Sequence, residues 1–359
     1  MHYSPVALRS NWAAIDIARA PWRVITRPMS DQNLDAITVP HHALPVIDVS
    51  GLRSAADTDR KAVGRALKAA CLDKGFFYMQ GHGVPEPLRQ SVFRQSEAFF
   101  ALPEAEKNAI ALEHSPCNRG YEPLRAQTLE IGQPPDLKEG FYSGPEIPAG
   151  DPRVLAGKFN HGPNQWPAAL PGFRPVMEEY HGVMVALGRL VMGGIALALD
   201  LPRDAFAGFC KDELATLRLL HYPPQPANPE PGEKGCGAHT DFGTLTFLAQ
   251  DDCGGLQVWD EAAGWMHAEP VAGSYVVNLG DMMARWSNGR FHSTLHRVVN
   301  VSGRQRYSVP FFYLGNPDYP IRCIDTCLAD GERPLHPDTT MEAHYQAMYR
   351  ATYNETTTT

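Results

Sequence analysis

The first half of the chain alternates short apolar runs with amphipathic stretches. The runs at 44–50 and 76–83 are apolar or aromatic and end at turn residues, which predicts two strands. Between them, the stretch 54–75 places apolar residues four positions apart and ends at a glycine, which predicts a helix. The same spacing predicts further helices over 85–103, 172–200 and 340–353.

After about residue 213 the pattern changes to short β-rich runs separated by glycine, aspartate and proline. Six such runs predict a β-sandwich or barrel. The region 111–170 is rich in proline, glycine and asparagine, so we expect loops with short strands there. Together these patterns predict an α+β fold in which helices support a C-terminal β core.

The same changes of pattern divide the chain into four parts. Residues 1–43 have weak periodicity and are interpreted as an N-terminal extension. A helical and mixed α/β region over 44–210 is expected to pack on the β core, which spans 211–318. Residues 319–359 form a C-terminal helix and tail in this interpretation.

Composition and charge argue against several classes of function. With 43% hydrophobic and 20% charged residues among 359, the chain can bury a large core. A net charge of −8 without a basic run argues against nucleic-acid binding through phosphates. The longest apolar stretch, 184–200, is interrupted by Arg189, so we expect a buried helix rather than a membrane span. Seven scattered cysteines without a CxxC pair, and no apolar run at the N-terminus, favour a cytoplasmic protein.

The stretch GCGAHTDFGTLTF, residues 235–247, places a histidine and a carboxylate two positions apart. If His239 and Asp241 lie on a strand, their side chains share a face and can provide two ligands for a divalent metal. A hydrogen-bonded polar pair at a strand end is the alternative for an isolated HxD pattern. Gly235 and Gly237 are interpreted as a flexible approach to the pair.

A third ligand is offered by the stretch RFHSTLHRVVN, residues 290–300. His296 adjoins two valines, so we expect it inside a core strand, whereas His292 lies beside a polar turn and is expected to be exposed. A structural role is the alternative for a single core histidine. Two histidines and one carboxylate on one face, with open positions beside them, are typical of non-haem Fe(II) oxygenases.

A strand over RQRYSVPFFY, residues 304–313, would place Arg306, Ser308 and Phe312 on one face. A buried guanidinium costs free energy unless an anion pairs with it. Bidentate binding of a ligand carboxylate by Arg306, with a hydrogen bond from Ser308, would remove this cost. A salt bridge to one of the 40 acidic residues of the chain is the alternative.

In this order and spacing the motifs resemble the isopenicillin N synthase-like branch of the Fe(II)- and 2-oxoglutarate-dependent oxygenases. The resemblance covers about residues 44–355. It rests on HxD, on a histidine in LHRVV 55 residues after Asp241, on RxS, and on the stretches LPVIDVS, GFFYMQGHGVP, NRGY, DLKEGFYSG and LRLLHYPP.

The resemblance implies a double-stranded β-helix, or jelly roll, that holds Fe(II) through His239, Asp241 and His296. Three protein ligands leave three of six positions, two for a chelating co-substrate and one for O2. Halogenation is not expected, because the halogenases of the family lack the carboxylate that corresponds to Asp241.

The resemblance also implies that 2-oxoglutarate chelates the iron and that its far carboxylate meets Arg306, Ser308 and Tyr222. A small-molecule substrate would be oxidised, most simply hydroxylated, while 2-oxoglutarate is converted to succinate and CO2.

The candidates for the substrate site are Arg218, Phe312, Asn118, Arg119 and Tyr121. Arg218 shares a strand face with Tyr222, so it is expected to point into the same cavity. A structural salt bridge is the alternative role for Arg218. Phe312 lies on the face of the RxS arginine, where it could stack on a planar substrate or serve as a core aromatic. The other three belong to NRGY, in a loop where relatives often build the mouth of the pocket.

Three alternatives stay open at this point. Isopenicillin N synthase and the plant ethylene-forming oxidases also carry RxS and need no 2-oxoglutarate. The stretches LRLLHYP, ARWSN and RYS resemble both the thymine hydroxylases of the family and the bacterial ethylene-forming enzyme. A jelly-roll binding protein without activity is the third alternative, although the complete ligand set argues against it.

Overall fold

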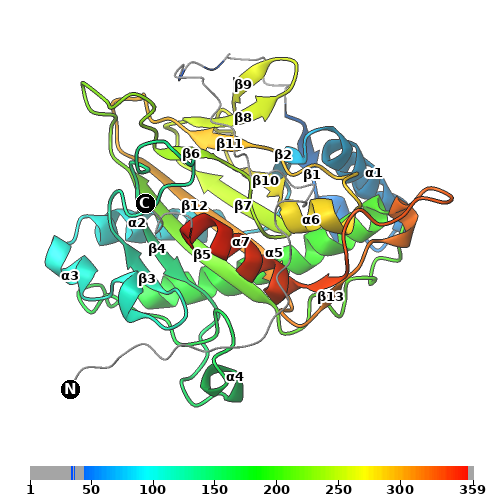
Figure 1. Ribbon diagram of the computed structural model, residues 1–359, viewed down its shortest axis with the longest axis horizontal. Coiled ribbons are helices and arrows are strands. Elements are labelled where there is room, and N and C mark those ends of the chain that lie inside the picture. Colours follow the sequence, from blue (N-terminus) through cyan, green and yellow to red (C-terminus); the bar gives the residue numbers. More distant parts are fainter. Residues whose placement is uncertain (1–33, 35, 37–43, 355–359) are drawn as a thin grey trace.

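Two β-sheets form the body of the molecule: the large sheet lies centrally among the helices, and the small sheet lies at the top of Figure 1. The structure, a computed structural model, describes residues Leu34, Ala36 and 44–354. In spatial order the large sheet contains β1 (Val46–Asp48), β2 (Phe76–Gln80), β10 (Tyr275–Leu279), β7 (Leu245–Gln250), β12 (Arg306–Gly315), β5 (Leu214–Tyr222), β4 (Glu139–Ser143) and β3 (Gly120–Glu122). The small sheet contains β6 (Cys236–His239), β11 (His296–Val298), β8 (Leu256–Asp260) and β9 (Gly264–His267).

The two sheets share an apolar core between their facing sides. Tyr78, Leu220 and Val276 of the large sheet are buried in one cluster with Val258 and Val298 of the small sheet. Apart from the parallel pair β1–β2, the paired strands of both sheets are antiparallel. Two packed antiparallel sheets with helices outside confirm the predicted α+β class.

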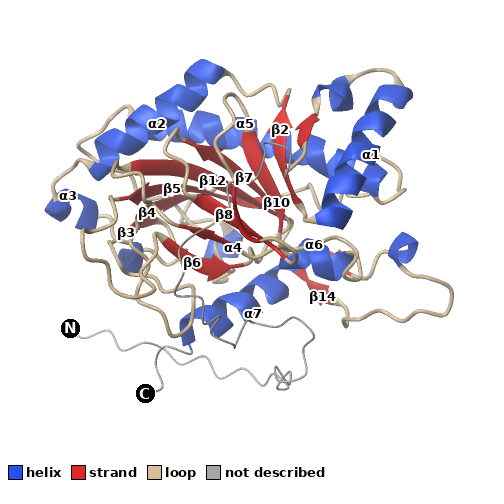
Figure 2. Cartoon of the chain, turned by 90° about the horizontal axis from the view of Figure 1, so that it is seen from above, coloured by secondary structure: helices blue, strands red, loops and turns tan. Residues whose placement is uncertain are grey.

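The long helices cover the outer side of the large sheet (Figure 2). They are α1 (Asp57–Asp73), α2 (Glu86–Phe100) and α5 (Phe173–Ala198). α5 is long and apolar enough to cross a membrane by length and composition, but 56% of its most apolar window is buried inside the protein. Its apolar side packs against α1, α2 and β12, which is the behaviour expected of a core helix.

Shorter elements complete the described part of the chain. They are the 3-10 helices η2 (Ser50–Arg53), η3 (Leu112–His114) and η4 (Asp325–Cys327), the helices α3 (Glu104–Asn108), α4 (Pro152–Leu155), α6 (Asp281–Trp286) and α7 (Met341–Asn354), and the strands β13 (Pro320–Ile321) and β14 (Thr339–Thr340). α7 confirms the helix predicted over 340–353.

The division between a supporting region and a β core is less sharp than the sequence predicts. β1 to β4 precede residue 210, yet they are part of the same sheet as β5, β7, β10 and β12. The region 44–210 is therefore joined to the core by strand pairing as well as by packing, because β2 pairs with β10 and β4 pairs with β5. Of the predicted N-terminal extension, 1–43, only Leu34 and Ala36 are among the described residues.

Candidate metal centre and adjoining cavity

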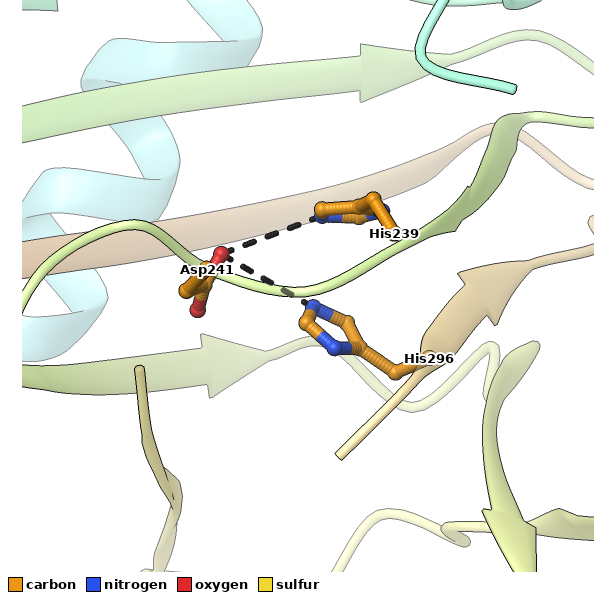
Figure 3. Close-up of side chains that lie close together, drawn as sticks. All are labelled: His239, Asp241 and His296. Carbon is orange, nitrogen blue, oxygen red and sulfur yellow. Dashed lines mark ion pairs between the residues drawn. The ribbon is translucent and has the colours of Figure 1, made fainter. Parts of the chain in front are cut away.

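Three side chains converge at one end of the small sheet. His239 ends β6, His296 begins β11, and the two residues are paired across these strands. Nε2 of His239 lies 3.8 Å, and Nε2 of His296 lies 3.9 Å, from Oδ1 of Asp241 (Figure 3). One ligand atom from each of the three residues lies within 4.8 Å of the others. Two imidazole nitrogens and one carboxylate oxygen so placed can hold one divalent metal ion.

Asp241 reaches this position in a different way from the one predicted. β6 ends at His239, so Asp241 lies beyond the strand, just before the bend at 242–244, and strand alternation does not orient it. The large sheet holds it instead: Thr246 Oγ1 and Asn278 Nδ2 donate hydrogen bonds of 2.6 and 2.7 Å to Oδ2. The backbone N–H of Asp281 donates a 2.7 Å bond to its carbonyl. One sheet therefore fixes the two histidines and the other fixes the carboxylate.

Backbone carbonyls orient both histidine rings. Nδ1 of His239 lies 2.8 Å from the carbonyl of Gly237, and Nδ1 of His296 lies 3.1 Å from the carbonyl of Thr294. A carbonyl only accepts hydrogen bonds, so each Nδ1 carries the proton and each Nε2 presents a lone pair toward the centre. His292 is exposed and lies outside the cluster, as predicted.

Burial and charge favour the metal-binding forms of Asp241 and His296. Burial by itself raises the pKa of Asp241, but the charges of the two histidines and the hydrogen bonds from Asn278 and Thr246 bring that pKa below its ordinary value. Burial lowers the pKa of His296 to about 4, and the charge of His239 acts in the same direction. At neutral pH the carboxylate is ionised and His296 is neutral, which are the forms that bind metals.

Arg306 is fully buried on the inner face of β12. Its Nε donates a 2.6 Å hydrogen bond to the carbonyl of Gly254, and its other nitrogens donate to Gln250 at 3.2 Å and Ser308 at 3.4 Å. Its guanidinium carbon lies 4.7 Å from the centre of the Tyr222 ring. Within the described part of the chain no carboxylate forms a salt bridge with Arg306. The predicted alternative of an internal salt bridge is therefore wrong for these residues, and an anionic ligand would supply the counter-charge.

Two family models match the chain. The model described as non-haem dioxygenase in morphine synthesis N-terminal matches residues 44–169, and that of the 2OG-Fe(II) oxygenase superfamily matches residues 214–315. The second match contains the HxD pair, His296 and the RxS pair. The chain belongs to the 2-oxoglutarate- and Fe(II)-dependent oxygenases.

Individual relatives support this membership over most of the chain. The 2-oxoglutarate-Fe(II) type oxidoreductase hxnY of Emericella nidulans is 43% identical over 316 residues, which cover 87% of this chain and 90% of that protein. The 2-oxoglutarate-dependent dioxygenase citB of Monascus ruber is 42% identical over 323 residues, covering 87% and 96%. A full-length Neurospora crassa protein, crystallised in complex with alpha-KG and thymine, has a TM-score of 0.76 and 30% identity, covering 86% and 97%.

These findings confirm an oxidoreductase that uses Fe(II), 2-oxoglutarate and O2 on a jelly-roll fold. They do not favour the alternative of an oxidase without 2-oxoglutarate, because the relatives are 2-oxoglutarate-dependent enzymes. The donor set of this oxygenase fits the metal, since it consists of two imidazoles and one carboxylate.

A cavity opens beside the three converging side chains, and His239 and Asp241 form part of its wall. Its empty space measures about 750 Å³, a figure that includes open solvent at the mouth. Aromatic rings, amides and guanidinium groups line it, as in many small-molecule sites. Four of the five residues predicted for the substrate site line it: Asn118, Arg119, Arg218 and Phe312.

Arg218 combines both roles that the sequence left open. It lines the cavity and also forms a buried salt bridge with Glu122. Gln127 accepts a 3.1 Å hydrogen bond from the same guanidinium, which lies 4.3 Å from the centre of the Tyr142 ring. These contacts hold a positive charge in a defined place on the cavity wall.

Tyr121 is the exception among the five, and its assignment to the cavity is wrong. Its hydroxyl donates a 2.6 Å hydrogen bond to Glu139, and its ring packs against Phe99 of α2 with centroids 6.0 Å apart. Successive strand residues face opposite sides of a sheet. Since the next residue, Glu122, meets Arg218 on the inner side, Tyr121 must face the helices.

Sequence reasoning missed other residues that line the cavity: Gln127, Leu129, Tyr142, Asn160, Phe242 and Tyr345. Tyr142 lies within DLKEGFYSG, so that stretch carried a signal. Asn160 accepts a 2.7 Å hydrogen bond from the side chain of Asn118 and, through its carbonyl, a 3.1 Å bond from Arg119. Tyr345 comes from α7 and meets Phe242 with ring centroids 6.1 Å apart, which no local pattern indicates.

Proposed function

We propose that His239, Asp241 and His296 hold the Fe(II) ion of this oxygenase. The support is the convergence of their Nε2 and Oδ1 atoms, together with the backbone and side-chain contacts that orient each group. The bound iron, with 2-oxoglutarate and O2, supplies the oxidising chemistry. The protein contributes the fixed geometry of the three ligands and the open side that faces the cavity.

We further propose that Arg306, Ser308 and Tyr222 bind the far carboxylate of 2-oxoglutarate. Arg306 is buried among neutral partners, so its charge stabilises an anion strongly at this position. Ser308 lies one step along the same strand face, and the Tyr222 ring lies beneath the guanidinium. Residues paired across β5 and β12 thus form one carboxylate-binding surface.

For the primary substrate we propose a small, planar molecule with hydrogen-bond acceptors, which the enzyme hydroxylates. Arg218, Arg119 and Asn118 place donors on one part of the cavity wall, and Phe312 and Phe242 place aromatic faces on it. Thymine, present in the Neurospora crassa structure, is a molecule of this kind. The oxygen balance is simple: one atom of O2 enters a substrate C–H bond and the other enters succinate, with loss of CO2.

A substrate screen tests this proposal. The protein is loaded anaerobically with Fe(II) and 2-oxoglutarate and titrated with nucleobases, aromatic carboxylates and matched cyclohexane carboxylates while its absorption spectrum is followed. Compounds that bind are then turned over under ¹⁸O₂ and analysed by mass spectrometry. We expect planar acceptor-bearing compounds to bind and to gain one labelled oxygen. Turnover confined to the non-planar compounds, or products without labelled oxygen, would overturn the proposal.

We also propose that the protein works in the cytoplasm. All seven cysteines are described by the structure and none forms a disulfide, which suits a reducing compartment. A fluorescent fusion of the full chain should remain in the cytoplasmic fraction of its host, and a secreted fusion would contradict this.

A further inference from the structure

One edge of β6 is closed by carboxylates instead of a strand. β6 is an end strand of the small sheet, and the loop between β3 and β4, residues 123–138, lies along it. Oδ1 of Asp136 accepts a 2.8 Å hydrogen bond from the N–H of Gly237, and Oε2 of Glu130 accepts a 2.8 Å bond from the N–H of Ala238. Edge N–H groups need partners, and charged acceptors are stronger partners than neutral ones.

Each of these carboxylates is paired with a lysine. Asp136 forms a salt bridge with Lys138, and both side chains are almost completely buried. Glu130 forms one with Lys234, at 3.1 Å. The N–H of Leu137 also donates a 2.8 Å hydrogen bond to the carbonyl of Lys234, which ties the loop to the segment just before β6. The charges are therefore compensated, and the carboxylates are held in place from both sides.

Gly237 connects this edge to His239. Its N–H is bound by Asp136, while its carbonyl accepts the hydrogen bond from Nδ1 of His239 that orients the imidazole ring. A Cβ atom at Gly237 would lie 2.7 Å from Cβ and 2.9 Å from the backbone nitrogen of Glu130. The loop therefore packs directly on the backbone of Gly237, and the interpretation of this glycine as a flexible approach is wrong.

The geometry points to Glu130 and Asp136 as positioning residues for His239. By fixing the peptide groups of Gly237 and Ala238, they set the direction in which Nε2 of His239 faces. The same loop lines the cavity through Gln127, whose carbonyl accepts a 2.8 Å hydrogen bond from the N–H of Asp136. One loop thus joins the cavity wall to the strand that carries the histidine. The inference rests on the proposed role of His239 as a metal ligand.

A Co(II) titration of the metal-free protein tests the inference without relying on activity. The visible absorption of bound Co(II) reports both its affinity and its ligand geometry. The variants are Glu130→Ala and Asp136→Ala, with Glu130→Gln and Asp136→Asn as variants that keep an acceptor oxygen. Asp151→Ala is the matched control, because Asp151 also accepts a 2.8 Å hydrogen bond from a backbone N–H, that of Arg153, but lies at the start of α4.

We expect each alanine variant to bind Co(II) about 10–100-fold more weakly and with an altered spectrum, as is typical when a group that orients a metal ligand is removed. Glu130→Gln and Asp136→Asn should recover most of the affinity, and Asp151→Ala should match the original protein. Alanine variants that bind within twofold of the original protein would overturn the inference. So would Gln and Asn variants that lose as much affinity as the alanine variants.

Two further measurements distinguish failure of this inference from misfolding of a variant and from failure of the proposed ligand role of His239. Because Asp136 is buried against Lys138, both Asp136→Ala and Asp136→Asn leave a buried lysine without its counter-charge and are open to misfolding. Glu130→Ala and Glu130→Gln, at a side chain 16% exposed, then decide the result. His239→Ala is titrated alongside. If it loses Co(II) binding while Glu130→Ala does not, the positioning role fails but the ligand assignment stands. If His239→Ala binds Co(II) as well as the original protein, the ligand assignment itself fails and the inference falls with it.

Discussion

Thr246 donates a 2.6 Å hydrogen bond to Oδ2 of Asp241, across the boundary between the large sheet and the segment that follows β6. Asn278, its paired neighbour on β10, donates a second bond of 2.7 Å to the same oxygen. These two bonds leave Oδ1 facing the histidines. The carboxylate of Asp241 is therefore held by a cross-strand pair of residues in the large sheet.

Thr246→Val removes one of these bonds while nearly preserving side-chain shape. We expect the affinity of the metal-free protein for Fe(II) or Co(II) to fall about tenfold, because the carboxylate gains freedom to rotate. Equilibrium titration measures the change. Thr326→Val, which removes a hydroxyl that donates to the carbonyl of Leu199 far from the centre, serves as the control. Equal affinities in the two variants would show that Thr246 does not hold the ligand.

Arg306→Ala should raise the KM for 2-oxoglutarate. A hydrogen bond to a charged group contributes about 1.5–3 kcal/mol, which corresponds to roughly a 10–150-fold change. Metal affinity should change little in a titration without 2-oxoglutarate, since the guanidinium donates to Gly254, Gln250 and Ser308 and not to the three metal-binding side chains. A KM that stays unchanged would mean that 2-oxoglutarate binds elsewhere.

Phe312→Ala should affect the substrate more than the co-substrate. Phe312 lines the cavity, whereas its strand neighbours Arg306 and Ser308 lie farther along β12. We expect a lower ratio of hydroxylated product to succinate, because a loosely held substrate lets 2-oxoglutarate turn over without productive oxidation. Parallel measurement of product and succinate gives this ratio. A raised KM for 2-oxoglutarate with an unchanged ratio would contradict the assignment.

Gly237→Ala should damage the metal centre although it adds only one methyl group. The new Cβ would approach Glu130 to 2.7 Å, so the loop or the strand must shift. We expect weaker Co(II) binding and a lower melting temperature. Gly182→Ala is the matched control, because no atom other than its chain neighbours and the backbone of its own helix lies within 4 Å of the Cβ position, and alanine favours the α5 helix. Melting curves and Co(II) titrations compare the two variants. Equal melting temperatures and equal Co(II) affinities in both would contradict the prediction.

Acid should destabilise the metal-free protein partly through His344. Burial lowers the pKa of this histidine to about 4, and the charge of Arg285 acts in the same direction, whereas its hydrogen bond to the carbonyl of Phe242 opposes the shift. Between pH 6.5 and 4 the unfolded chain binds a proton that the folded chain does not, so stability falls as the pH falls.

The His344 contribution can reach about 3 kcal/mol, at about 1.4 kcal/mol for each pKa unit. Denaturant unfolding at pH 7 and pH 4.5 measures it. We expect His344→Gln to lose less stability between these two pH values than the original protein does. An identical loss in both would show that His344 does not contribute.

Local sequence patterns were sufficient to identify most elements and the chemistry of the site. Periodicity indicated α1, α2, α5 and α7, and the short β-rich runs indicated β5 and the strands from β7 to β12. Residue type and spacing made His239, Asp241 and His296 candidate ligands, and the family resemblance implied that these three hold the iron. The structure brings the three side chains together and leaves His292 exposed. These features depend on the order of apolar and polar residues along a few turns or strand positions, so they can be read without knowing the fold.

Contacts between segments that are far apart in the chain are determined by the tertiary structure alone. Thr246 and Asn278 hold Asp241, Glu130 and Asp136 close the edge of β6, and Tyr121 faces away from the cavity that its neighbours line. Each of these relations depends on strand register and loop packing between segments far apart in the chain. A one-residue change of register would reverse which side chains face inward, and nothing in the local pattern at Tyr121 or Asp136 specifies it.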